Sequence, residues 1–272
     1  MTVEVTFWGV RGSFPCATPQ HMEFGGNTSC VSVNCDGEWI ILDAGTGIWQ
    51  LGKHLARNRV TKATLLLSHS HTDHIVGFPF FAPAWMGHFD LSIMAGHLHD
   101  KGGVRDVFAQ FTRDPVFPVQ LDNMGGMFRF VDFPIGKTHK IGPFTIRTGP
   151  LNHPNGACGY RIEAEGKSVA YITDTEHTKG TLDKHVLKLI DKVGLFIYDA
   201  TYTDEEYESK IGWGHSTWQE GLRLAEKAQA QRYAIFHHDP ERTDDKLRLL
   251  EAEATERSPV TFVSRERQVI VL

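Results

Sequence analysis

The most informative stretch of the sequence is His69-Ser-His71-Thr-Asp73-His74, which directly follows the apolar run 63–68. The run has the length of a strand and ends abruptly in polar residues, which predicts a buried strand opening into a loop. Burial would leave the polar atoms of these imidazoles and the carboxylate unsatisfied unless they were paired, so packing alone explains them poorly. His69 and His71, two residues apart, would not share a helix face, but on an extended loop they can converge on one ion.

Asp73 and His74 then fit the first turn of the following segment, where they can face a second ion. The simpler alternative is a group of surface histidines with Asp73 as a helix cap. The composition favours metal chemistry, because the chain has 15 histidines and only four cysteines. Imidazole and carboxylate are nitrogen and oxygen ligands suited to divalent ions.

The rest of the composition excludes several classes of protein. The 272 residues are 41% hydrophobic and 22% charged, which is ordinary for a globular protein and excludes disordered, collagen-like and coiled-coil chains. The net charge of −5 argues against a sequence-independent grip on long nucleic acid. A small anionic ligand stays open, since a metal site can supply positive charge locally.

No apolar run approaches the roughly 18 residues of a membrane helix. The first seven residues carry an acid and alternate like a strand, unlike a secretory signal. We therefore expect a cytoplasmic protein without a membrane partner. Four scattered cysteines, Cys16, Cys30, Cys35 and Cys158, do not resemble a disulfide framework and fit reduced thiols in that compartment.

Strands and helices alternate along what we expect to be a single domain, 1–272. Runs rich in β-branched and aromatic residues predict strands at 3–8, 30–34, 39–43, 63–68, 128–133, 144–148, 160–163, 168–173, 195–200, 233–236 and 260–263. Helical spacing of apolar residues predicts helices within 182–193, 218–228 and 245–256, the second opened by Thr217 and Glu220 as a capping box. The irregular stretch 78–127 is either a lid or substrate-binding insertion, or an insertion that merely packs.

The H-x-H-x-D-H motif at a strand end resembles the metallo-β-lactamase superfamily. The resemblance implies an α/β fold, an αββα four-layer sandwich, with a binuclear metal site on one edge. It also implies further ligands downstream, and the sequence supplies His153, Asp174 and His237, each after a predicted strand. Taken alone, His153 would be a solvated loop residue and Asp174 a turn residue. His238 is the alternative to His237 as the last ligand.

Two further segments, Asp199-Ala-Thr-Tyr202 and Gly214-His215-Ser216-Thr217, are similar to the phosphodiesterase branch of that superfamily. This branch contains tRNA 3′-processing endonucleases and cyclic phosphodiesterases of phosphonate catabolism. The resemblance implies that His215 contacts phosphate and acts as general acid, oriented by Asp199, with Ser216 beside it. The alternative for Ser216 and Thr217 is helix capping.

The N-terminal segments Gly9-Val-Arg11-Gly-Ser13, Gly25-Gly26-Asn27-Thr28-Ser29 and Leu42-Asp43-Ala-Gly-Thr-Gly47 also look like this branch. Arg11 and Asn27 are candidate substrate contacts, although Arg11 could equally form a salt bridge. Asp43 is expected to orient a ligand histidine, with a plain turn aspartate as the alternative. Cys16, Cys30 and Cys35 lack tight metal-ligand spacing, so buried thiols are favoured over a structural metal site.

The predicted function is hydrolysis of a phosphodiester, small or cyclic, by a water that two divalent ions share and activate. Zn²⁺ is the first choice of metal and Mn²⁺ the second. Asp73 binds metal and steers the water, Asp174 bridges the ions, and His215 protonates the leaving group. The alternatives are a tRNA 3′-processing endoribonuclease, a thioester, lactone or β-lactam hydrolase, and a non-catalytic metal-bound scaffold. Relatives of this kind often form homodimers.

Overall fold

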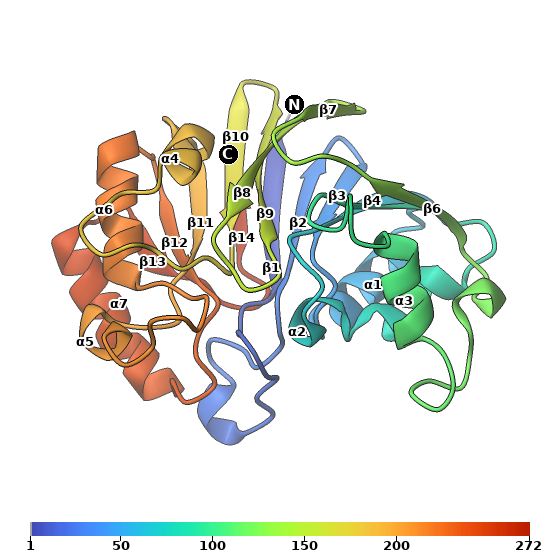
Figure 1. Cartoon of the computed structure of the whole chain (residues 1–272), viewed down its shortest axis with the longest axis horizontal. Helices are drawn as coiled ribbons and strands as arrows, with labels where there is room; N and C mark the ends of the chain where they lie inside the picture. Colours follow the sequence, from blue (N-terminus) through green and yellow to red (C-terminus); the bar gives the residue numbers. More distant parts are fainter. Residues whose placement is uncertain (1) are drawn as a thin grey trace.

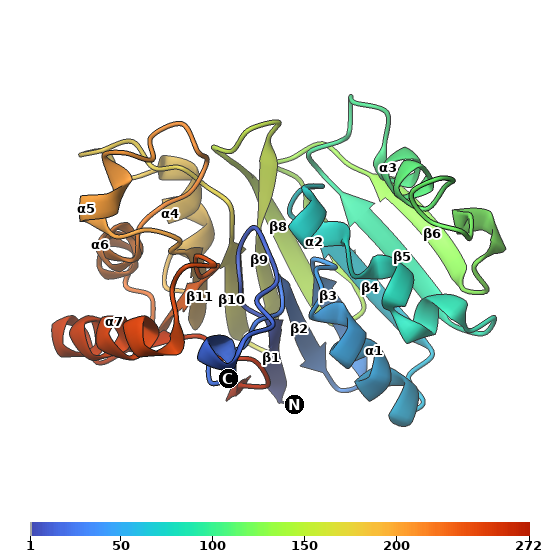
Figure 2. The same ribbon diagram turned by 90° about the horizontal axis from the view of Figure 1, so that it is seen from below.

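The structure is a computed structural model that describes residues 2–272. Two seven-stranded sheets pack face to face, and helices cover the outer face of each (Figures 1 and 2). The predicted αββα sandwich is therefore confirmed. No helix within residues 2–272 is long and apolar enough to cross a membrane.

The first sheet has the strand order β14-β1-β2-β3-β4-β5-β6. Its strands are β1 Val3–Gly9, β2 Cys30–Cys35, β3 Glu38–Leu42, β4 Lys62–Leu67, β5 Asp90–Ala95, β6 Met127–Asp132 and β14 Val269–Val271. The strands β3 to β6 are mutually parallel, while β14, β1, β2 and β3 pair antiparallel. The helices α1 Ile48–Arg57, α2 Thr72–Ile75 and α3 Val104–Phe111 follow strands of this sheet.

The second sheet has the strand order β13-β12-β11-β10-β9-β8-β7. Its strands are β7 Thr138–Ile141, β8 Phe144–Leu151, β9 Ala157–Ala164, β10 Lys167–Ile172, β11 Leu195–Asp199, β12 Tyr233–Phe236 and β13 Thr261–Val263. The strands β10 to β13 are parallel, and β7 to β10 pair antiparallel. Its helices are α4 Lys184–Ile190, α5 Asp204–Tyr207, α6 Trp218–Ala228 and α7 Asp244–Arg257.

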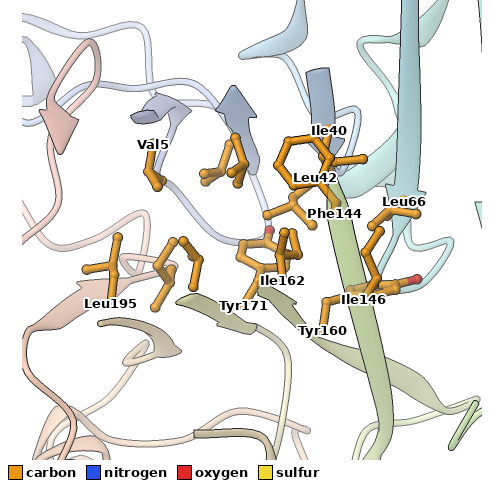
Figure 3. Close-up of a cluster of buried hydrophobic side chains, with 14 of the residues drawn as sticks. Val5, Ile40, Leu42, Leu66, Phe144, Ile146, Tyr160, Ile162, Tyr171 and Leu195 are labelled. Carbon is orange, nitrogen blue, oxygen red and sulfur yellow. The ribbon is translucent and has the colours of Figure 1, made fainter. Parts of the chain in front are cut away.

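The core between the sheets is formed by the inward faces of both. Val5, Ile40 and Leu66 of the first sheet face Ile146 and Leu195 of the second (Figure 3). Two further clusters lie outside the sheets, one under α1 and α3 and one under α4, α6 and α7. Alternating burial along β1 fits a strand with one face in this core.

Strand direction explains where the functional side chains gather. β1 is antiparallel to β2, which is antiparallel to β3, so β1, β3 and β4 all end at one edge of the first sheet. By the same reasoning, β8, β10, β11 and β12 all end at one edge of the second sheet. The backbone N–H of Cys158 donates to the carbonyl of Ser68, which joins these two edges.

Part of the stretch 78–127 packs in the sandwich, whereas the sequence predicted a lid or substrate-binding insertion, or an insertion that merely packs. It contains β5, which pairs with β4 and β6 in the middle of the parallel half-sheet, and α3. The sequence analysis also missed α1, which begins after Gly47 without a capping side chain and so lacks the usual start signal. The short edge strands β7 and β14 were missed as well.

Candidate metal centre

The motif of the first sheet lies where β4 ends. Ser68 to His71 form the loop after β4, and Asp73 and His74 lie on α2, as the sequence predicted. His69 and His74 are buried, whereas His71 and Asp73 are half-buried. The second sheet adds His153 after β8, Asp174 after β10 and His237 after β12. The structure therefore brings together all seven residues predicted as ligands.

Asp174 lies between two groups of imidazoles. Its Oδ1 is 3.1 Å from His74 Nε2 and 3.2 Å from His237 Nε2. Its Oδ2 is 3.7 Å from His69 Nε2 and 3.8 Å from His153 Nε2. The two oxygens of one carboxylate thus face different sets of nitrogen atoms, which is the arrangement that a carboxylate bridging two cations requires.

Each group is completed by a residue of the segment that follows β4, His71 of the loop or Asp73 of α2. His71 Nδ1 lies 3.0 Å from His153 Nε2, beside His69. Asp73 Oδ2 lies 3.3 Å from His74 Nε2 and 3.5 Å from His237 Nε2. The donor atoms of each triad, His69-His71-His153 and Asp73-His74-His237, lie within 4.8 Å of one another.

The donor set fits divalent metal ions. The Nε2 atoms of His69, His74 and His237 are buried, yet none has a hydrogen-bond partner within residues 2–272. Such atoms are costly to bury unless something binds them. Nitrogen and oxygen donors of this kind suit Zn²⁺, and the carboxylates also suit Mn²⁺.

The electrostatics agree with this chemistry. Burial lowers the pKa of His69, His71 and His153, which keeps these imidazoles neutral and able to donate a lone pair. Burial would also lower the pKa of His74, but Asp174, Asp73 and Asp43 raise it well above its usual range. The negative charge gathered here needs positive charge beside it, which divalent cations supply.

Asp43 contacts the motif through Ser68 and His74, where the sequence predicted an orienting residue. Its Oδ2 accepts from Tyr171 Oη at 2.8 Å and Ser68 Oγ at 2.7 Å, and it lies 2.8 Å from His74 Nδ1. His74 Nε2 is thereby turned toward Asp174. Asp43, Asp174 and His237 all have positive φ angles, a conformation that costs non-glycine residues energy and gathers at functional sites.

The seven candidate ligands form one cluster, and His215 and Asp199 form a pair beside it. His215 Nδ1 lies 2.9 Å from Asp199 Oδ2 and 3.7 Å from Asp174 Oδ2. Burial would lower the pKa of His215, but Asp199 raises it to about 9. Asp199 is itself held by the N–H of Thr175 and by the hydroxyl of Thr201. Asp199 therefore favours the protonated form of this imidazole, which lies next to the candidate metal ligands.

The structure separates His237 from His238. His237 Nε2 points at Asp73 and Asp174, and its Nδ1 lies 3.0 Å from Thr201 Oγ1. His238 Nε2 instead lies 2.9 Å from the carbonyl of Ser264, away from the cluster, and its ring is buried.

Three predicted substrate contacts are corrected. Arg11 is fully buried, where its guanidinium donates to the carbonyls of Gly25, Asp239 and Arg242. Asn27 donates to Glu266 through both its backbone and its side-chain amide.

Ser216 is fully buried, and its hydroxyl accepts from Tyr198 and lies 2.7 Å from His177 Nδ1. These three side chains hold loops and core elements in place, and none of them lines the cluster. Thr217 caps α6, as its alternative reading predicted.

Sequence reasoning missed residues that touch the ligands through backbone atoms. The N–H of Ser13 donates to Asp73 Oδ2 at 2.8 Å. At Gly12, an added Cβ would lie 2.3 Å from the His237 ring. At Gly214, whose φ is positive, it would lie 2.5 Å from the His153 ring. The Gly-Ser and Gly-His pairs in these loops are the signals that could have found them.

The cysteines considered for a structural metal site are not among the clustered residues. Cys30 and Cys35 are buried at opposite ends of β2, about 17 Å apart at 3.3 Å per residue. That separation prevents them from sharing one ion.

Comparison with known proteins places this geometry in a family. Residues 38–238 match the family described as the beta-lactamase superfamily domain. The chain belongs to this superfamily. The resemblance drawn from the H-x-H-x-D-H motif is therefore confirmed, and the chain is a metal-dependent hydrolase of the metallo-β-lactamase fold.

Relatives within the superfamily cover nearly the whole chain. Ribonuclease Z of Haloarcula marismortui is 24% identical over 87% of this chain and 86% of its own length. The structure of YhfI from Bacillus subtilis covers 100% of this chain and 99% of its own, with 20% identity and a TM-score of 0.75. Human tRNase Z, short form, covers 98% of both chains, with 18% identity and a TM-score of 0.68.

Proposed function

We propose that this protein is a binuclear metal-dependent phosphodiesterase. The observation that carries the proposal is the placement of Asp174 between two triads, with the protonated His215–Asp199 pair 3.7 Å away. His69, His71 and His153 would hold one ion, Asp73, His74 and His237 the other, and Asp174 both. Bound divalent ions would lower the pKa of water and neutralise charge on the phosphate oxygens.

The side chains perform the remaining steps. Asp73 has one oxygen fixed by the N–H of Ser13, so its carboxylate is held in one orientation beside His74 and His237, where it would bind metal and steer the attacking water. His215, protonated through Asp199, donates its Nε2 proton to the leaving alkoxide, since the pair uses Nδ1. General acid assistance of this kind contributes about 10²–10⁴-fold to a rate.

The proton donor favours phosphodiesters over thioesters. An alkoxide leaves slowly at neutral pH unless it is protonated, and a pKa of about 9 favours protonated His215 there. A thioester releases a thiolate, which needs much less help. A lactone or a β-lactam also releases a group that needs a proton, so the support against these two classes is the segment 214–217, which resembles the phosphodiesterase branch. Hydrolysis of thioesters, lactones or β-lactams is the second candidate.

The substrate within the phosphodiesters has two candidates. The acidic balance of the chain favours a small or cyclic diester. The names of the relatives, Ribonuclease Z and tRNase Z, favour an RNA end. The names are the more specific support, so precursor tRNA with a 3′ trailer is the first natural substrate to test.

A substrate panel tests the proposal. The metal-loaded protein is given bis-p-nitrophenyl phosphate, a cyclic nucleotide, a precursor tRNA, a lactone and a cephalosporin. We expect turnover of at least one phosphodiester and much slower turnover of the lactone and cephalosporin. Efficient turnover of the lactone or cephalosporin, with all three phosphodiesters left intact, would overturn the proposal.

A further inference from the structure

Two large aromatic side chains are exposed on the loops that contact the metal ligands. Phe14 is 67% exposed and Trp213 is 59% exposed. Exposing aromatic side chains forfeits the free energy of burial, so two of them on loops next to a polar cluster call for a physical reason.

Phe14 stands beside the triad of Asp73, His74 and His237. It directly follows Ser13, whose N–H donates to Asp73, and Gly12, which packs against the His237 ring. The N–H of Phe14 donates to the carbonyl of Gly12, which tightens this turn. The side chain therefore projects from a backbone that is fixed to one half of the cluster.

Trp213 lies beside the other triad of the cluster, which contains His153. It precedes Gly214, whose carbonyl lies 2.7 Å from His153 Nδ1, and it is two residues from His215. The carboxylate of Glu176 accepts from the N–H groups of Gly212 and Gly214, which anchors the loop on both sides of Trp213.

Lys210 covers one face of the Trp213 ring, so a base would stack on the other face. Its Nζ lies 4.2 Å from the Trp213 ring and 5.7 Å from the Tyr202 ring. The Tyr202 ring lies 6.1 Å from the ring of His215. Trp213 and a cation are thus on the His215 side of the cluster, where the leaving group of a phosphodiester would be.

We propose that Phe14 and Trp213 are stacking platforms for the nucleobases on the two sides of the scissile phosphate, with Lys210 near the adjoining backbone. The inference rests on the proposed function and names its substrate class as nucleoside phosphodiesters. A phosphodiester has two arms, and one exposed aromatic residue is anchored to each half of the cluster. Stacking on aromatic side chains tolerates any base, because every base has a π face.

The test compares two substrates that differ only in their bases. One is adenylyl-(3′→5′)-adenosine, and the other is its abasic analogue with the same sugars and phosphate. The readout is the ratio of their kcat/KM values for each variant, which cancels changes in metal content or folding. Stacking contributes about 1–3 kcal/mol per base, which corresponds to roughly 5- to 150-fold in this ratio.

We expect the wild-type protein to prefer the adenine dinucleotide, and Phe14→Ala or Trp213→Ala to lower that preference at least about fivefold. Trp213→Tyr should keep most of it. The matched control is Trp85→Ala, because Trp85 is also exposed but lies where β5 and β6 begin, at the edge opposite the cluster. This control should keep the wild-type ratio.

The outcomes separate this inference from the proposed function. Equal turnover of both substrates by the wild-type protein, or unchanged ratios in Phe14→Ala and Trp213→Ala, would overturn the stacking role while phosphodiesterase activity stands. Hydrolysis of another phosphodiester of the panel, but of neither dinucleotide, would also overturn the stacking role. Failure of the wild-type protein to hydrolyse any phosphodiester of the panel would instead refute the proposed function.

Discussion

The first sheet delivers four of the seven clustered residues on one short segment, the loop after β4 and the helix α2, whereas the second delivers three from the ends of three strands. The first group, His69, His71, Asp73 and His74, is fixed by the local path of the chain and by Asp43. The second group is fixed by strand register.

In that register, Ile172 of β10 pairs with Tyr198, and Asp199 pairs with Phe236 of β12, which aligns the strand ends. The difference teaches that a short motif can define half of a site and that sheet topology must complete it.

The largest expected effect comes from a single residue of the second sheet. Asp174→Ala should lower activity by about four orders of magnitude or more, because this carboxylate faces both triads. His71→Ala, on the first sheet, should cost less, since His71 belongs to one triad. Steady-state kinetics with metal analysis checks both variants, and equal losses would contradict the special position of Asp174.

The next effect separates proton donation from metal binding on the second sheet. His215→Ala should slow hydrolysis of a diester with an alkoxide leaving group by about 10²–10⁴-fold. It should slow bis-p-nitrophenyl phosphate far less, because that leaving group needs no proton. Full turnover of the alkyl diester by this variant would refute the general acid role.

A smaller effect is expected at Asp43, which contacts a candidate ligand of the first sheet from the side away from the other ligands. Asp43→Asn should weaken metal binding by about 10–100-fold, because a neutral amide replaces the charged acceptor that aims the His74 ring. Tyr171→Phe removes one hydrogen bond to the same Asp43 oxygen and should weaken metal binding less. Metal titration measures both, and unchanged affinity in Asp43→Asn would show that His74 is aimed by its packing alone.

The smallest effect is a shift in pH dependence. His215 donates a proton only while protonated, so the rate should fall as the pH rises through its pKa of about 9. Asp199→Asn removes the charge that raises this pKa, so the alkaline limb should move down by about 1–3 units. At pH 7 the rate of this variant should therefore fall by at most about tenfold. A pH–rate profile with an unmoved alkaline limb would contradict the pairing.

The sequence predicted most of the fold, and it named the seven residues that the structure brings together. The strand followed at once by the H-x-H-x-D-H motif is a local pattern that identifies His69 to His74. His153, Asp174 and His237 were expected only through the family resemblance, because taken alone each would be an ordinary loop or turn residue. The orientation of a side chain depends on the other sheet and could not be inferred. Arg11 and Asn27 looked like substrate contacts, but Arg11 binds carbonyls far along the chain and Asn27 binds Glu266.

Strands that lack a clear pattern were also missed for a physical reason. β5 carries polar residues among apolar ones and is surrounded by turns, so its pairing between β4 and β6 is decided by neighbours distant in sequence. His237 and His238 are chemically identical neighbours. The contacts of His237 with Asp73 and Asp174 and the contact of His238 with Ser264 distinguish them, and these contacts depend on other strands.

The central claim is that side chains from both sheets together hold two divalent ions. The most direct measurement is the metal content of the purified protein by elemental analysis, before and after removal with a chelator and reconstitution with Zn²⁺ or Mn²⁺. We predict about two equivalents per chain, with hydrolysis lost on removal and regained on reconstitution. Protein that carries no bound ion and hydrolyses equally well after chelation would contradict the claim.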